Sequence, residues 1–163
     1  MQRTDTYTIV NIPNPLDQHF RGMAAHYDNY YYSVESPGAA SYGLNVHEYL
    51  HSIVNPLVSR YHEQFHARLD ASFQAGKSGP MAASYQNLEG FTSECLVRAL
   101  DHRLRVKFEN NPSMTRNLEA QVADITRQGL TLTEPFYRLL DVYEANGTTP
   151  FEQFLPTLFD GVR

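Results

Sequence analysis

Apolar side chains after residue 43 recur at the three- and four-residue spacing of helices. The Asn55-Pro56 pair predicts a kink or break, since proline lacks an N–H donor and disfavours helical geometry in the residue before it. An amphipathic helix then resumes from Pro56 to about residue 74. The first run has its apolar stripe at Leu44, Val46, Leu50, Ile53, Val54 and Leu57. Four later helices are predicted at about residues 88–108, 117–128, 133–145 and 150–159.

The start of the chain favours strands instead. Residues 6–12 and 29–34 are rich in β-branched and aromatic side chains, and each run is followed by a proline-containing turn signal. We therefore expect an α+β fold that is mainly α-helical. A single domain is expected over residues 1–163, with strands and loops in about 1–45 and mainly helices in about 46–163.

Composition narrows the functional classes. The chain has 163 residues, 42% of them hydrophobic, and a formal net charge of -5 with no run of Lys or Arg, which argues against nucleic acid as a partner. Its one cysteine, Cys95, excludes an internal disulfide. No apolar run approaches the roughly 20 residues of a membrane span. The first residues do not encode a signal peptide, so localisation stays open and includes a secreted or periplasmic protein whose leader has been removed.

The first helical run contains His47-Glu48-Tyr49-Leu50-His51, an H-E-x-x-H pattern. Residues four apart lie one above the other on a helix, so both imidazoles can reach one tetrahedral zinc ion. Glu48 lies about 100° further around the helix and can accept a proton from the metal-bound water. Both histidines lie at the margin of the apolar stripe, on the core-facing side. The pattern predicts zinc ligands; the alternative is a pair of hydrogen-bonded core imidazoles.

The same pattern occurs again at residues 62–66, with His62 and His66 as its histidines. Here Phe65 and Leu69 carry the apolar stripe and charged residues surround the histidine pair, which is typical of a half-exposed helix. His51 and His62 lie about 16 Å apart along a continuous helix, so the two motifs cannot share one metal. We predict that the first motif is the metal site and that the second is a solvated helix edge.

A catalytic zinc normally has three protein ligands, so two histidines require a partner. The best candidate is Glu94, on a predicted helix beside apolar residues such as Cys95, where a buried carboxylate needs a counter-charge or a metal. An ordinary i,i+4 ion pair between Glu94 and Arg98 is the alternative. Glu89 is a weaker candidate, because a carboxylate near a helix start is explained by the helix dipole.

These segments resemble the gluzincin zinc metallopeptidases, which combine H-E-x-x-H on one helix with a glutamate ligand from a later one. They are similar in particular to a little-studied bacterial family of uncharacterised metallopeptidases with an H-E-x-x-H-x-x-x-N-P segment and an E-x-L-V-R-A-like helix, here residues 47–56 and 94–99. The resemblance covers about residues 30–104. It implies a zincin-like fold, zinc on His47, His51 and Glu94, and Glu48 as general base. Gluzincins often have an acid four residues after the glutamate ligand, where this chain has Arg98.

Peptide hydrolysis through this site also needs a hydrogen-bond donor for the tetrahedral oxyanion. Tyr85, in the loop before the Glu94 helix, is the first candidate, with His102 and Tyr137 after it. If residues 30–34 form an edge strand beside the motif helix, an extended peptide could pair with its backbone. Peptide or protein is therefore the expected substrate, although amides other than peptides would use the same site.

Two other functional classes remain open. One is a catalytically inactive zincin-like module that binds metal or a protein partner. The other is a structural helical domain whose histidine pairs are accidental, from which no metal would copurify. Completion of the cleft by a partner domain or an upstream region, and the oligomeric state, are left undetermined by the sequence.

Overall fold

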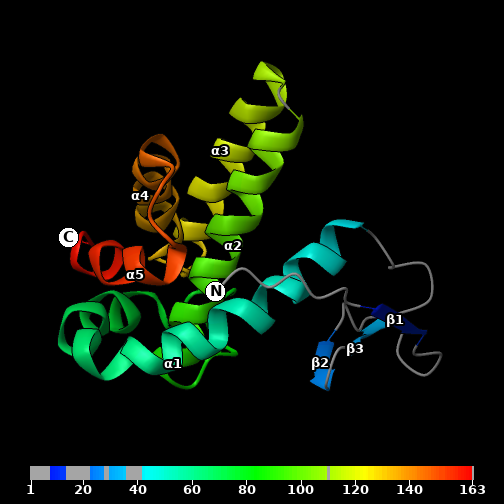
Figure 1. Cartoon of the computed structure of the whole chain (residues 1–163). Coiled ribbons are helices and arrows are strands. Elements are labelled where there is room, and N and C mark those ends of the chain that lie inside the picture. Colours follow the sequence, from blue (N-terminus) through cyan, green and yellow to red (C-terminus); the bar gives the residue numbers. More distant parts are fainter. Residues whose placement is uncertain (1–7, 14–22, 28–29, 36–41, 110, 163) are drawn as a thin grey trace. The chain divides into compact units, whose positions relative to one another are not determined.

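The computed structural model describes residues 8–13, 23–27, 30–35, 42–109 and 111–162, and for the strands it describes the backbone alone (Figure 1). Packing divides the chain into two compact units, Met1–Ser52 and Ile53–Arg163. The division falls inside α1, which is one unbroken helix from Tyr42 to Gly76.

Three strands form a small sheet in the first unit: β1 (Thr8–Pro13), β2 (Met23–Tyr27) and β3 (Tyr30–Glu35). The order is β1-β3-β2, with β1 parallel and β2 antiparallel to β3. β3 is therefore the central strand, and its backbone pairs on both sides. The expectation that residues 30–34 form an edge strand open to an extended peptide is wrong.

α1 runs through Pro56, where a kink or break was expected. Proline leaves the Ser52 carbonyl without an amide partner four residues on. Val54 and Val58, one on each side of the proline, are fully buried, and packing of this face holds the helix together across the defect. The two predicted helices of this region are one element of 35 residues.

The second unit contains the rest of α1 and four more helices: α2 (Leu88–Glu109), α3 (Pro112–Arg127), α4 (Thr133–Asn146) and α5 (Phe151–Asp160). α2 is the most enclosed of them, since every residue from Phe91 to Val97 is buried. Aromatic contacts join the helices in the core. Ring centroids lie 5.2 Å apart between Phe73 and Phe91, 5.4 Å apart between Phe65 and Phe159, and 5.8 Å apart between Phe136 and Phe159.

α3 begins at Pro112, about five residues before the predicted start. Asn111 is its N-cap, and the side-chain oxygen accepts hydrogen bonds from the backbone N–H groups of Ser113 and Met114. Proline suits the first helical position, where its missing N–H would have no partner in any case. The Asn111-Pro112 pair therefore starts a helix.

The end of α1 meets the turn between α3 and α4 through glycines. A Cβ atom on Gly76 would lie 2.0 Å from the carbonyl oxygen of Gly129, and one on Gly79 would lie 2.4 Å from that of Gln128. Gly129 also has φ of +115°, which other residues rarely adopt. A backbone hydrogen bond of 3.1 Å from the Met81 N–H to the Gln128 carbonyl closes the crossing. This contact fixes where the α1–α2 loop begins.

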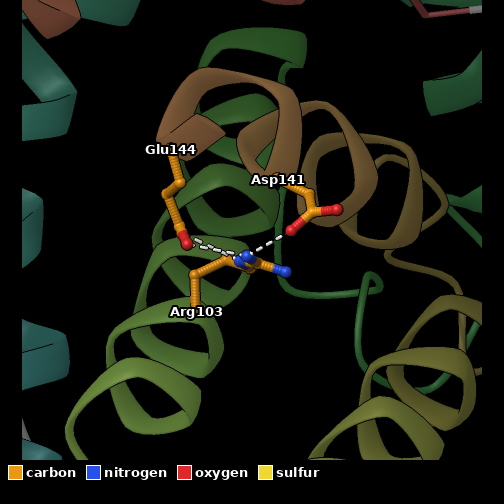
Figure 2. A network of polar contacts seen from close by, with 3 residues as sticks. All are labelled: Arg103, Asp141 and Glu144. Atoms are coloured by element: carbon orange, nitrogen blue, oxygen red, sulfur yellow. Dashed lines mark hydrogen bonds and ion pairs between the residues drawn. The ribbon is translucent and has the colours of Figure 1, made fainter. Parts of the chain in front are cut away.

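Arg103 links α2 to α4 (Figure 2). Its Nε and Nη2 atoms donate to the two carboxylate oxygens of Glu144 at 2.9 and 2.7 Å, and Nη2 also donates to Asp141 at 2.6 Å. The guanidinium carbon lies 5.0 Å from the centre of the Tyr137 ring. The Arg103 side chain is 13% exposed, so these contacts are largely shielded from water.

The expected α+β, zincin-like fold class is wrong. Among residues whose side chains the structure describes, every regular element is a helix, and the buried core consists of helical and loop residues alone. The β-branched and tyrosine-rich start of the chain favoured strands and hence an α+β fold. The helical periodicity after residue 43 is instead sufficient to build a closed hydrophobic core by itself.

Candidate metal centre

α1 carries the two histidines of the first motif. His47 and His51 are half-buried, and their ring centroids lie 5.1 Å apart with the ring planes 77° from one another. Leu50 and Val54, which are buried, flank them on the helix. Packing of these apolar residues turns the histidine face inward, so both imidazoles are presented on one side, a turn apart.

α2 supplies the carboxylate. Glu94 is 3% exposed, on a turn where Phe91 and Cys95 have no exposed surface. The start of this helix is fixed by Asn87, whose side-chain oxygen accepts a 2.8 Å hydrogen bond from the Gly90 N–H. An acid enclosed by apolar groups is stable as a charge only with a cation or strong donors beside it.

One ligand atom each from His47, His51 and Glu94 lies within 4.8 Å of the other two. A tetrahedral zinc with bonds near 2.1 Å requires ligand atoms about 3.4 Å apart. The ligand atoms would therefore have to close by no more than about 1.4 Å to hold such an ion. Two imidazole nitrogens and one carboxylate oxygen form a donor set that suits zinc with one position left for water. The residues fit a catalytic type of metal site.

Arg98 contacts the same carboxylate. Its Nε donates a 2.5 Å hydrogen bond to Glu94 Oε1, and its side chain is 29% exposed. The ion pair weighed above as an alternative to metal binding is thus present, at the very residue that is grouped with the two histidines. The ion pair and metal binding were considered as alternatives. A carboxylate has two oxygens, however, so Glu94 can bind Arg98 through one and a metal through the other.

Tyr85 lies in the loop before α2 and is half-buried. Burial raises the pKa of its phenol, and the charge of Glu94 and a hydrogen bond to that carboxylate raise it further. A phenol is protonated at neutral pH in any case, and these surroundings oppose its ionisation further. The Tyr85 ring packs beside the first turn of α2, since a Cβ atom on Gly90 would lie 3.8 Å from it. The structure thus places Tyr85 against a candidate ligand, and its role as oxyanion donor stays a prediction.

Glu48 is half-buried on the turn of α1 between the two histidines. Its position follows from helix geometry, about 100° around the axis from His47. The role of general base stays a prediction.

The second motif has different surroundings. His66 is exposed, and no group of three ligand atoms among the described residues includes His62 or His66. His62 Nδ1 lies 3.0 Å from the Ser59 carbonyl, and Nε2 lies 3.1 Å from a Glu63 oxygen. The hydrogen bond to Ser59 raises the pKa of His62, as does the charge of the two glutamates Glu63 and Glu89. These contacts suit a protonated imidazole better than a metal ligand.

The two other candidate donors belong elsewhere. His102 is buried on α2, where Nδ1 lies 2.8 Å from the Arg98 carbonyl, and burial lowers its pKa. Tyr137 lies on α4 beneath Arg103. The sequence offered the contact from Arg98 to Glu94 only as an alternative to metal binding, not as a contact made at the same site. The only signal for this contact was the i,i+4 spacing, which is common on ordinary helix surfaces.

Comparison with protein-family models, with curated proteins and with solved structures finds no match. The resemblance to gluzincins therefore stays a prediction from the two segments that carry it. Among the described residues, none of the helices is both long and apolar enough to span a membrane.

Proposed function

We propose that this protein is a zinc-dependent peptidase whose metal is bound by His47, His51 and Glu94. The observation that supports it is the convergence of these three side chains, from helices 43 or more residues apart, to within 4.8 Å. A chance H-E-x-x-H on a helix places two histidines together but brings no third ligand. The convergence concerns metal binding, and peptide hydrolysis is inferred from the added presence of Glu48 and Tyr85.

Zinc bound to two histidines and one carboxylate supplies Lewis acidity and a water molecule of lowered pKa. Glu48 is placed on the motif helix to accept a proton from the attacking water and to return it to the leaving amine. Tyr85 is a protonated phenol at neutral pH, so its O–H can donate to an oxyanion as charge develops there. Glu94 is held at the site by α2, whose surrounding residues are buried.

Metal content tests the site. Elemental mass spectrometry on protein purified without a histidine tag should find about one zinc per chain, and His47→Ala or Glu94→Ala should remove it. His62→Ala is the matched control, because it alters the other H-E-x-x-H and should leave the zinc in place. Absence of zinc after resupply, or its loss in the His62 variant alone, would refute the site.

Activity tests the reaction. Glu48→Gln should keep the zinc and reduce hydrolysis of unfolded casein or of a quenched-fluorescence peptide library by 10²-fold or more, because the proton acceptor is gone. Tyr85→Phe should also keep the zinc, with a loss in kcat of about 10²-fold. Zinc retained in all three proteins with no hydrolysis dependent on Glu48 would instead favour the non-catalytic, metal-binding module.

A further inference from the structure

Glu94 and Arg98 form an ion pair in which the negative group is buried and the positive group is partly exposed. The carboxylate is 3% exposed, while the guanidinium that binds it reaches the surface with 29% of its side chain exposed. Tyr85 adds a hydrogen bond to the carboxylate but brings no positive charge. A buried carboxylate without a nearby cation is strongly disfavoured. Arg98 therefore provides a permanent positive charge next to the candidate zinc ligand.

A second ion pair on α2 also joins a buried acid to a partly exposed arginine four residues later. Asp101 is 4% exposed, and Arg105, four residues later, binds it through Nε at 3.1 Å and through Nη2 at 3.0 Å. The Arg105 side chain is 37% exposed. Asp101 does not belong to the described group of three ligand atoms, whereas Glu94 does. α2 thus holds two buried acids with matched arginine partners, and only one of the acids lies at the candidate metal centre.

We propose that Arg98 is the counter-charge that replaces the metal in the metal-free protein, so that the fold does not depend on zinc. This inference rests on the proposed metal site. A guanidinium bound to Glu94 Oε1 balances the buried carboxylate when no cation is present. A zinc ion bound to the same carboxylate would be repelled by the guanidinium, because both are positively charged. Arg98 makes the metal-free protein stable and weakens zinc binding in return.

The departure from the gluzincin pattern at this position then has a physical meaning. An acid four residues after the glutamate would add negative charge to the centre and strengthen metal binding. Arg98 has the opposite sign, because it reduces the net negative charge that attracts the cation. The protein can therefore fold first and take up the metal afterwards.

The test is thermal unfolding of Arg98→Met with and without one equivalent of zinc, at about pH 8, above the usual imidazole pKa of roughly 6.5. Metal-free Arg98→Met should melt roughly 5–10 °C below wild type. Zinc should restore most of that loss and should bind on the order of tenfold more tightly than to wild type, because the repulsion is gone. Arg98→Lys keeps the charge and should behave as wild type.

Arg105→Met is the matched control. It removes the partner of a buried acid on the same helix, so its metal-free melting temperature should fall by a similar amount, but zinc should not restore it. If zinc raises the melting temperature of Arg98→Met no more than that of wild type, the inference is wrong while the metal site stands. If zinc binds to neither protein, the proposed function itself fails.

A double variant guards against a protein that does not fold. Arg98→Met combined with Glu94→Gln replaces the buried charge by a neutral amide, which needs no counter-charge. If Arg98→Met alone does not fold without zinc, the double variant should fold, as should Arg98→Met refolded with zinc. Failure of both to fold would overturn the counter-charge role.

Discussion

Replacement of Arg103 by methionine should destabilise the protein far more than replacement of an exposed arginine such as Arg138. Methionine keeps the apolar length of the side chain and removes the guanidinium (Figure 2). Two Arg103 donors hold the two oxygens of Glu144, a carboxylate 28% exposed, and one holds Asp141, which is 69% exposed. Because exposure to water weakens an ion pair, the contact with Glu144 should contribute more to the free energy of unfolding than the contact with Asp141.

The bidentate, charge-assisted contact with Glu144 contributes about 1.5–3 kcal/mol to the free energy of unfolding, because it is partly shielded from water. The exposed contact with Asp141 contributes about 0–1 kcal/mol. Stacking of Arg103 on Tyr137 adds about 0.5–1 kcal/mol. The expected loss is therefore about 2–5 kcal/mol, or roughly 5–15 °C in melting temperature for a chain of this length.

Urea denaturation of Arg103→Met against wild type measures the loss. Arg138→Met is the control, since Arg138 binds Glu134 on the same helix, α4, but is 75% exposed, and it should change the unfolding free energy by no more than about 0.5 kcal/mol. Double-mutant cycles should give a larger coupling energy with Glu144→Gln than with Asp141→Asn. Equal losses in Arg103→Met and Arg138→Met, or a larger coupling with Asp141, would refute this account.

Two further predictions concern the backbone crossing and the buried histidine. Gly129→Ala should lower the free energy of unfolding in urea by about 2–4 kcal/mol, because φ is +115° and the added Cβ would lie 2.6 Å from the Gly76 carbonyl oxygen. Gly147→Ala is the control. There φ is +52° and no atom would lie nearer to the Cβ than 4.0 Å, so the loss should be only about 1 kcal/mol. Burial lowers the pKa of His102 below 6.5, so the unfolded chain binds its proton more readily and stability should fall as the pH drops below about 6.5. Unfolding free energies at pH 7.5 and 5.5 should differ less in His102→Gln than in wild type, and an unchanged difference would contradict the assignment.

The sequence predicts much of the helical part because apolar spacing alone defines where α2, α4 and α5 lie. It fails where one residue has two compatible roles. Pro56 is a helix breaker in isolation, yet burial of Val54 and Val58 on either side outweighs the lost hydrogen bond. Pro112 follows one helix and also begins the next, since proline suits the first helical position. Local propensity cannot choose between such roles; tertiary packing does.

At the candidate site, the sequence could name His47, His51 and Glu94 because donor type and helical spacing are local properties. Their convergence is a tertiary property that no spacing rule contains, and it is seen only once α1 and α2 are folded. The fold class was wrong for a related reason. Strand propensity at the start of the chain says nothing of whether those residues join the core of the helical part.

The proline inside α1 has a consequence for hydrogen exchange. Pro56 has no amide proton, and the Ser52 carbonyl has no amide partner one turn later, so the hydrogen-bond ladder of the 35-residue helix is interrupted there. Each side is then held by its own packing and can open with its own free energy. Slow-exchanging amides should divide into two groups at this point. Because the motif histidines lie before the interruption, the protection gained within α1 on metal uptake would be confined to its amino-terminal group and would report occupancy without any assay of turnover.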